Sequence, residues 1–389
     1  MNYARLAATV IALSLFWSGC YVVRGLRYLG PDVRDGDRFA ARSLPPAPKP
    51  DSLARAARAL PLAGYALRDS DDSISMADYL AAINTAGLLV VRGDSVVYEY
   101  YGEDYGAAQP VLAYSVTKSW IGALVGIAVE EGRLQVSDPV RKYLPELDEA
   151  DWQAVTVEHV LQMTTGNTFR EDEHIFHENA RFYLGKGLRR KTLRQTTAEP
   201  PGRSFRYRSG DTQLLTQILE AAVQPQTVTE YLHEKLWIPL GIRTEGRFNV
   251  DRPGPEGIEK GFCCLNATAA AHAKLGMVYR DGGRWRNEQV LPRTWVEHTR
   301  RIDTTAGSAP HYQYHWWLGD AESGVFLAEG IINQFIYVDP RYDLVIVKQS
   351  DGYGVWNKWT FMESITQRVL RAMGEAPAPE EAIEQRPGR

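Results

Sequence analysis

Two pairs of short apolar runs, one early and one late in the chain, have the residue types of β-strands. The first pair covers residues 87–91 and 95–100, joined by an Arg-Gly-Asp turn. The second covers residues 334–338 and 344–348, joined by a turn that contains proline. Val, Ile, Tyr and Phe favour strands, and glycine or proline between two such runs favours a turn. The pattern predicts a β-hairpin near each end of the folded part.

Between the hairpins the spacing of apolar residues is that of helices. It recurs along residues 156–163, 211–223 and 228–236, and a last helical pattern covers residues 358–373. Residues 116–131 are apolar nearly throughout, which is typical of a buried helix, and Gly132 follows as a stop signal. This order predicts an α/β (α+β) fold: an antiparallel sheet flanked by helices, plus a mostly helical lobe. We expect a ligand cleft between the lobes.

The two ends of the chain differ in composition from the part between them. An uncharged stretch near the N-terminus lies between two arginines, which is typical of a signal peptide or a membrane anchor. Cys20 follows Ser-Gly, as at the end of a lipoprotein signal, so it is a candidate for lipidation. The predicted division is signal or anchor 1–23, linker 24–50 with a proline-rich end, folded domain 51–373 and disordered tail 374–389. We expect the domain in a bacterial periplasm or cell envelope, attached to the membrane through the N-terminal segment.

Composition and charge bear on possible partners. Of the 389 residues, 44% are hydrophobic and 24% are charged, as in an ordinary soluble globular protein. The net charge is −4 and no stripe of basic residues is evident, so no nucleic-acid partner is expected. Cys263 and Cys264 are adjacent, and neighbouring Cα atoms lie about 3.8 Å apart, too close for an unstrained disulfide. We expect this pair to pack as small apolar side chains.

Ser115 stands at the start of the long apolar helix, three residues before Lys118. Residues at this spacing share one helix face, so the two side chains are expected to meet. The free N–H groups and partial positive charge of a helix N-terminus favour an alkoxide and ease loss of the lysine proton. Ser115 is therefore a candidate nucleophile. The alternative is that Ser115 only caps the helix and Lys118 lies in solvent.

Tyr207 is a candidate proton acceptor for that serine. It lies in a loop between Gly202 and Gly210, just before the predicted helix 211–223. A tyrosine acts as a base only if its pKa falls below its usual value of about 10, and a nearby Lys118 ammonium would lower it. The alternative is a partly buried loop tyrosine without a catalytic role.

Three segments in this order resemble the three motifs of serine β-lactamases and penicillin-binding proteins. They are Ser115-Val116-Thr117-Lys118, Tyr207-Arg208-Ser209 and Ala328-Glu329-Gly330. Residues 134–145, 157–166 and 236–241 also look similar, and the resemblance spans residues 87–373. The flanking sequence most resembles class C β-lactamases and the related 6-aminohexanoate-oligomer hydrolases and esterases. The resemblance implies that residues 51–373 form a serine hydrolase domain with a β-lactamase/transpeptidase-like fold.

The resemblance also implies a role for each matching residue. Ser115 would be the nucleophile that forms an acyl-enzyme, and Lys118 and Tyr207 its proton relay, with the choice of base left open. The backbone N–H groups of Ser115 and Ile331 would form the oxyanion hole, because Ile331 follows the strand glycine, Gly330. The reaction would be hydrolysis of a small-molecule amide or ester, with no cofactor.

Three positions depart from the family pattern. Ser209 stands where the second motif usually has asparagine, and Ala328 where the third usually has lysine or histidine. Ala328 offers no charge to a substrate carboxylate, a loss of about 1.5–3 kcal/mol in binding. β-Lactams are therefore expected to be poor substrates, and an amidase or esterase is favoured. Asn333 replaces a glycine expected after the third motif, which leaves the local strand geometry open.

The walls of the pocket are less well defined. Ser209 and Gly330 are expected to contact the substrate, and Trp316 and Trp317 to line the cleft, with core packing as the alternative for the tryptophans. Residues 173–177 hold a glutamate and two histidines, but without a completing ligand we expect solvated side chains and no metal. The rival functions are a β-lactamase or D,D-peptidase and a catalytically silent binder of cell-wall fragments. The sequence leaves the oligomeric state open.

Overall fold

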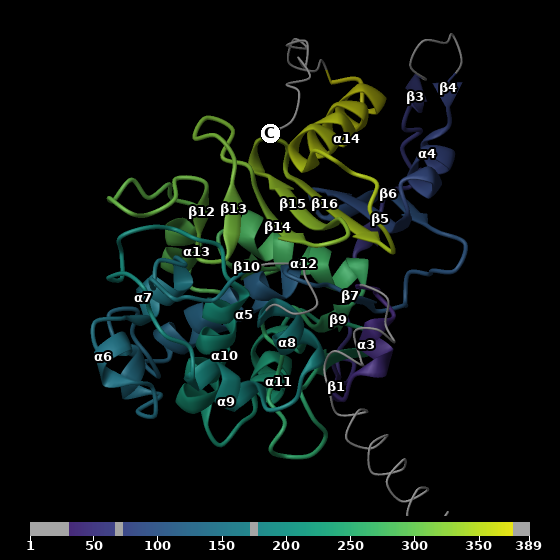
Figure 1. Cartoon of the computed structure of the whole chain (residues 1–389). Coiled ribbons are helices and arrows are strands. Elements are labelled where there is room, and N and C mark those ends of the chain that lie inside the picture. Colours follow the sequence, from purple (N-terminus) through teal and green to yellow (C-terminus); the bar gives the residue numbers. More distant parts are fainter. Residues whose placement is uncertain (1–30, 67–72, 172–177, 376–389) are drawn as a thin grey trace, which may run out of the picture.

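The computed structural model describes residues 31–66, 73–171 and 178–375. Its largest element is an eight-stranded sheet with helices on both faces and a helical lobe beside it (Figure 1). All neighbouring strands of this sheet are antiparallel except β2 and β6. In order across the sheet they are β12 (Tyr312–Gln313), β13 (Trp316–Leu318), β14 (Phe326–Gly330), β15 (Gln334–Asp339), β16 (Leu344–Ser350), β5 (Thr85–Arg92), β6 (Ser95–Tyr101) and β2 (Ala54–Arg55).

The two hairpins expected from the sequence are present and lie side by side. Strands β5 and β6 form the first, β15 and β16 the second, and β16 pairs with β5 so that Lys348 lies opposite Leu88. Every residue of β16 is buried, because this strand has neighbours on both edges and helices on both faces. The predicted antiparallel sheet is thus built from segments at opposite ends of the chain.

Helices cover both faces of the sheet (Figure 1). Helices α14 (Lys358–Ala372) and α4 (Met76–Ala82) pack on one face, in an apolar cluster with alternate residues of β5, β15 and β16. Helices α12 (Ala269–Arg280) and α5 (Val116–Glu130) pack on the other, in the largest apolar cluster. Residues alternate between the faces of a strand, so each strand supplies both clusters.

The long apolar helix expected at residues 116–131 is α5, and Gly132 follows it with a φ of 68°. Its residues are buried all round from Val116 to Ala128, because the helix lies between the sheet and the helical lobe. The lobe contains α6 (Glu149–Trp152), α7 (Val157–Leu161), α8 (Glu178–Leu184), α9 (Leu188–Leu193), α10 (Ser209–Val223), α11 (Val228–Leu232) and η2 (His233–Trp237). Helix α10 starts two residues earlier than expected.

A second, smaller sheet has the order β1-β8-β9-β7: β1 (Ala41–Leu44), β8 (Gly246–Asn249), β9 (Leu265–Ala267) and β7 (Val111–Leu112). Strand β7 ends three residues before Ser115. Strand β1 and the short helix α3 (Asp35–Arg38) fall in the segment predicted to be a linker, which is a correction. Composition concealed this, because β1 is short and only its last residue, Leu44, is buried.

Short elements complete the described chain: η1 (Val140–Lys142), α13 (Arg293–Thr299), η3 (Pro340–Tyr342), and the pairs β3 (Tyr65–Ala66) with β4 (Ser73–Ile74) and β10 (Arg284–Trp285) with β11 (Glu288–Gln289). Among the helices described, none is long and apolar enough to cross a bilayer. The signal or anchor, Cys20 and the C-terminal tail after residue 375 lie outside the described residues, so those assignments stay predictions.

Candidate active site

Ser115 occupies a tight turn between β7 and α5. The residue before it, Tyr114, has a φ of 44°, and Ser115 itself is already in the right-handed helical region. The Ser115 side chain does not cap the helix; its Oγ accepts a hydrogen bond from Lys118 Nζ at 2.7 Å. The capping alternative is therefore wrong, and the i, i+3 spacing brings the two side chains together as expected.

Lys118 is buried, with 1% of its surface exposed, which excludes the solvated alternative. Besides Ser115, its Nζ donates to Ser209 Oγ at 3.1 Å and to the Phe262 carbonyl at 2.8 Å. Burial lowers the pKa of Lys118 to about 8, while the Glu171 carboxylate acts in the opposite direction. About a tenth of such amines are neutral at pH 7, compared with well under a hundredth for an ordinary lysine.

Tyr207 lies beside this pair. Its ring stacks on Trp317, with centroids 5.3 Å apart, and meets the ring of Tyr312 edge-on at 5.8 Å. Lys118 Nζ lies 4.9 Å from the ring centroid of Tyr207. Burial raises the pKa of Tyr207 above its ordinary value, and a hydrogen bond with Ser115 opposes this only in part. The expectation that Lys118 would lower this pKa is therefore wrong, because burial is the largest influence on the phenol.

Ser209 connects the lysine to an acidic residue that the sequence did not single out. The Glu171 carboxylate accepts from the Ser209 N–H at 2.6 Å and from its Oγ at 2.7 Å. A carboxylate on the first N–H of α10 is favoured by the partial positive charge of the helix N-terminus. A surface pocket beside Tyr207 is lined by residues 166–171, 198–199 and 206–208, so Glu171 also borders open space.

Gly330 ends β14 directly against the serine turn. A Cβ on this glycine would lie 2.6 Å from the Ala113 carbonyl and 3.1 Å from the Ser115 backbone nitrogen. Only glycine allows the strand to approach so closely. Ile331, the next residue, is 38% exposed, so its backbone lies at the surface of the same corner. The predicted oxyanion-hole residues, Ser115 and Ile331, thus both adjoin the close contact between Gly330 and the serine turn.

The third motif itself contributes no positive charge. Ala328 faces the apolar cluster of α5 and α12, where it is buried. Its neighbour Glu329 forms an ion pair with Lys358 at the start of α14. Lys358 Nζ lies 4.6 Å from the ring centroid of Trp317, which in turn stacks on Tyr207. A cation is thus present near the site, but a carboxylate of the protein neutralises it.

The two tryptophans proposed as cleft walls have different environments. Trp317 lies beside Tyr207, on which its ring stacks, and its contact with substrate stays a prediction. Trp316 is fully buried against Tyr279 and Phe326, with ring centroids 4.7 and 5.1 Å away, so its assignment to the substrate pocket is wrong. The reason is the alternation of side chains along β13, which turns adjacent residues to opposite faces.

Asn333 occupies the glycine-like position after the third motif with a φ of 63°. Its side chain compensates for the left-handed backbone. Oδ1 accepts from Gly354 N at 2.8 Å and Val355 N at 2.9 Å, and Nδ2 donates to the Val355 carbonyl at 3.0 Å. Asparagine tolerates this conformation better than most residues, so the strand geometry is kept.

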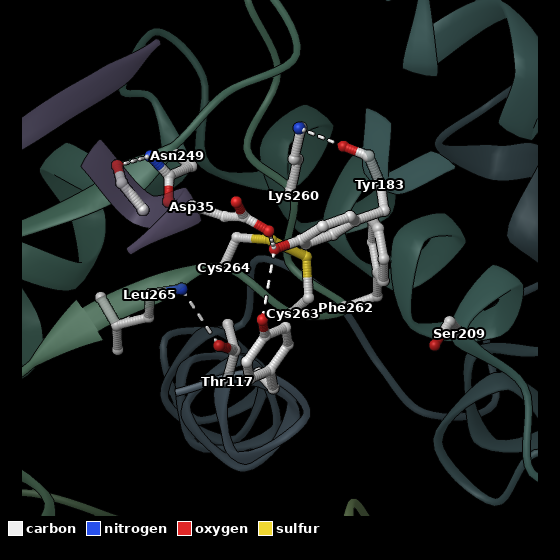
Figure 2. The surroundings of a disulfide bond; sticks show 12 residues. Asp35, Thr117, Tyr183, Ser209, Asn249, Lys260, Phe262, Cys263, Cys264 and Leu265 are labelled. Carbon is white, nitrogen blue, oxygen red and sulfur yellow. Dashed lines mark hydrogen bonds between the residues drawn. A yellow bond between two sulfur atoms is a disulfide. The ribbon is translucent and has the colours of Figure 1, made fainter. Parts of the chain in front are cut away.

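One further feature was misjudged from the sequence, and another stays a prediction. Cys263 and Cys264, next to Phe262, form a disulfide (Figure 2), although they are buried as expected. Their Cα atoms are 3.7 Å apart, so this short spacing does not by itself prevent the bond. The possible zinc ligands of residues 173–177 lie outside the described residues; within the described ranges no group of His, Cys, Asp and Glu is arranged to hold a metal.

Comparison with known proteins assigns the family. A family model described as Beta-lactamase matches residues 75–354, well over half of the chain. The chain belongs to the Beta-lactamase family. The 6-aminohexanoate-dimer hydrolase of Paenarthrobacter ureafaciens is 30% identical to it over 290 residues, which are 68% of this chain and 72% of that protein. The resemblance stated from the motifs is confirmed, and the protein is a serine hydrolase of the β-lactamase fold.

Solved structures support the fold assignment. A Bacillus anthracis protein assigned provisionally as a 6-aminohexanoate-dimer hydrolase aligns with a TM-score of 0.78 at 21% identity, covering 89% of this chain and 94% of that one. EstCE1, a hydrolase with promiscuous acyltransferase activity, aligns with a TM-score of 0.61 at 16% identity, covering 75% and 96%. The predicted fold class is confirmed.

Proposed function

We propose that this protein hydrolyses an amide or ester through an acyl-enzyme on Ser115. The observation that carries the proposal is the short contact between Ser115 Oγ and the buried Lys118 Nζ, with Tyr207 hydrogen-bonded to the same serine. An isolated serine hydroxyl is a poor nucleophile, and an adjacent amine that is partly neutral removes its proton. A silent binder has no need of such an arrangement.

The two pKa directions favour a division of labour between the relay residues. Lys118, with its lowered pKa, takes the proton as Ser115 Oγ attacks the carbonyl carbon. The N–H groups of Ser115 and Ile331 stabilise the resulting oxyanion. Tyr207, with its raised pKa, stays protonated and passes a proton to the leaving amine or alcohol, recovering one from Lys118. Water then attacks the acyl-enzyme by the same route in reverse.

The charges around the site favour substrates without a carboxylate next to the reacting group. Ala328 supplies no cation, and Lys358 is already paired with Glu329. Glu171 adds a negative charge beside Ser209. These features support a linear amide or ester over a β-lactam, consistent with the similarity to a 6-aminohexanoate-dimer hydrolase.

Export to the cell envelope is part of the proposal. It rests on the uncharged N-terminal stretch of the sequence and on the disulfide, because disulfides persist mainly in oxidising compartments. Fractionation of cells that express the full chain, with the protein traced to the membrane, periplasm or cytosol, tests this part separately from the chemistry.

Parallel rate measurements on nitrocefin, a p-nitrophenyl ester and a linear amide test the chemical proposal. We expect the ester and amide to be hydrolysed faster than nitrocefin. Ser115→Ala should abolish all three activities. Ser119→Ala is the matched control, since Ser119 lies on the same buried helix and donates to the His315 carbonyl, away from the reacting atoms. Preferred turnover of nitrocefin would overturn the substrate assignment, and an active Ser115→Ala enzyme would overturn the mechanism.

A further inference from the structure

The Cys263–Cys264 disulfide lies directly behind the active site. It belongs to an apolar cluster that also contains Tyr114 and Ile332, the residues that flank Ser115 and Ile331 in sequence. In Figure 2 the sulfur atoms lie between the Asp35–Tyr183 pair and helix α5, with Phe262 beside them. Cys263 and Cys264 are 4% and 0% exposed, so their surroundings leave little space for movement.

The chain around the disulfide is tied to the elements that carry Ser115 and Lys118. Across the ladder of β7 and β9, Ala113 N donates to the Leu265 carbonyl at 2.9 Å, just before the serine turn. Leu265 N donates to Thr117 Oγ1 at 3.0 Å, on the first turn of α5 (Figure 2). The disulfide is thus one residue from a direct contact with the nucleophile helix.

On its other side the disulfide adjoins the Phe262 carbonyl, one of the three acceptors that hold Lys118 Nζ. That carbonyl belongs to the peptide that Phe262 forms with Cys263. The N–H groups of Cys263 and Cys264 both donate to the Lys260 carbonyl, at 3.1 and 3.0 Å, and bend the chain into a turn. This turn directs the Phe262 carbonyl toward Lys118. The direction of this acceptor therefore depends on the backbone of the cysteine pair.

We propose that the Cys263–Cys264 disulfide is a positioning element of the active site, which holds the Phe262 carbonyl on Lys118 and whose reduction lowers turnover. The proposal rests on the proposed function, in which Lys118 is the base. Reduction breaks the S–S bond and forms two S–H groups, with two electrons and two protons supplied by a dithiol that itself becomes a disulfide.

The physical reason is the space that two thiols need. Bonded sulfurs lie about 2 Å apart, whereas non-bonded heavy atoms prefer roughly 3.5–4 Å. In a buried site this extra separation has to be taken up by the turn that carries the Phe262 carbonyl. Misplacement of a catalytic group by about 1 Å can cost on the order of a hundredfold in rate.

The experiment compares the oxidised and dithiothreitol-reduced full-length enzyme on a p-nitrophenyl ester, with the state of the pair established by alkylation and intact mass. We expect kcat to fall about ten- to hundredfold on reduction, with a smaller change in KM, and to recover on reoxidation. The rise of kcat/KM with pH should move to lower pH, because an ammonium that loses an acceptor gives up its proton more easily. A general loosening of the fold would not shift this limb.

The double variant Cys263→Ser/Cys264→Ser is the matched control, because its two hydroxyl oxygens are not bonded and also need more separation than the bonded sulfurs. It should have the lowered kcat and be insensitive to dithiothreitol. If dithiothreitol does not reduce the buried disulfide, this variant tests the proposal instead. Wild-type kcat and an unmoved pH limb in the fully reduced enzyme, or in the folded double variant, would overturn the proposal. If the double variant does not fold, reversible reduction of the wild type decides. Failure of the oxidised enzyme to hydrolyse the ester would count against the proposed function instead.

Discussion

Replacing Glu171 by glutamine should shift the pH dependence of the enzyme toward lower pH. Glu171 holds Ser209, and Ser209 Oγ lies 2.7 Å from its carboxylate and 3.1 Å from Lys118 Nζ, so the two charges are at most 5.8 Å apart. At this distance a unit charge contributes about 3 kcal/mol at an effective dielectric constant of 20 and about 0.7 kcal/mol in water. Because Glu171 is an exposed residue, the lower part of this range applies. The expected decrease in the pKa of Lys118 is about 0.5–1 unit.

The assay is kcat/KM on a p-nitrophenyl ester across the pH range around 8, the pKa of Lys118, at constant ionic strength. The wild-type rate should rise through this value as Lys118 becomes neutral, and the Glu171→Gln rate should rise at lower pH. Glu199→Gln is the matched control, since that carboxylate lines the same pocket but bonds Ser204. If the rise of kcat/KM with pH stays in place or moves to higher pH in Glu171→Gln, the assignment of this rise to Lys118 is refuted.

Four other substitutions separate the roles of the site residues. Tyr207→Phe should lower amide turnover about 10²–10⁴-fold and p-nitrophenyl ester turnover much less, because p-nitrophenolate leaves without a proton; equal losses on both substrates would count against an acid role. Gly330→Ala should lower kcat at least about a hundredfold, since its Cβ would collide with the Ala113 carbonyl, while circular dichroism shows the fold retained. A near-normal kcat would contradict the placement of the oxyanion hole at Ser115 and Ile331. Trp316→Ala should lower the free energy of unfolding, measured with denaturant, by about 3–5 kcal/mol. Trp317→Ala should mainly change kcat/KM. The reverse pattern would contradict the placement of Trp316 in the core and of Trp317 beside Tyr207.

Local sequence patterns predicted the hairpins, the buried helix and the meeting of Ser115 with Lys118. Each of these depends on periodicity within one segment: two residues per repeat for a strand and about 3.6 for a helix. The spacing of Ser115 and Lys118 is itself part of the helical repeat, so their contact at 2.7 Å follows once the helix forms. The loop position of Tyr207 made it a candidate. Its assignment to the proton relay of Ser115 came from the resemblance to a family, since its contact with Ser115 joins distant segments.

The features that the sequence did not predict depend on contacts between segments. Glu171 is one of several charged residues in its loop, and only the approach of α10 selects it as the partner of Ser209. The Phe262 carbonyl is a backbone atom, so no residue type signals it. Trp316 and Trp317 are indistinguishable by composition, and the strand phase that buries one of them is set by pairing with β14.

The central claim is that Lys118 makes the Ser115 hydroxyl reactive, and mass spectrometry of the acid-quenched enzyme during turnover of a slow ester tests it most directly. The account predicts one acyl group per chain on the peptide that contains Ser115, formed rapidly in the wild type and absent in Ser115→Ala. Lys118→Ala should form this adduct at least about a hundredfold more slowly. An acyl group on another residue, or equally rapid acylation without Lys118, would contradict the claim.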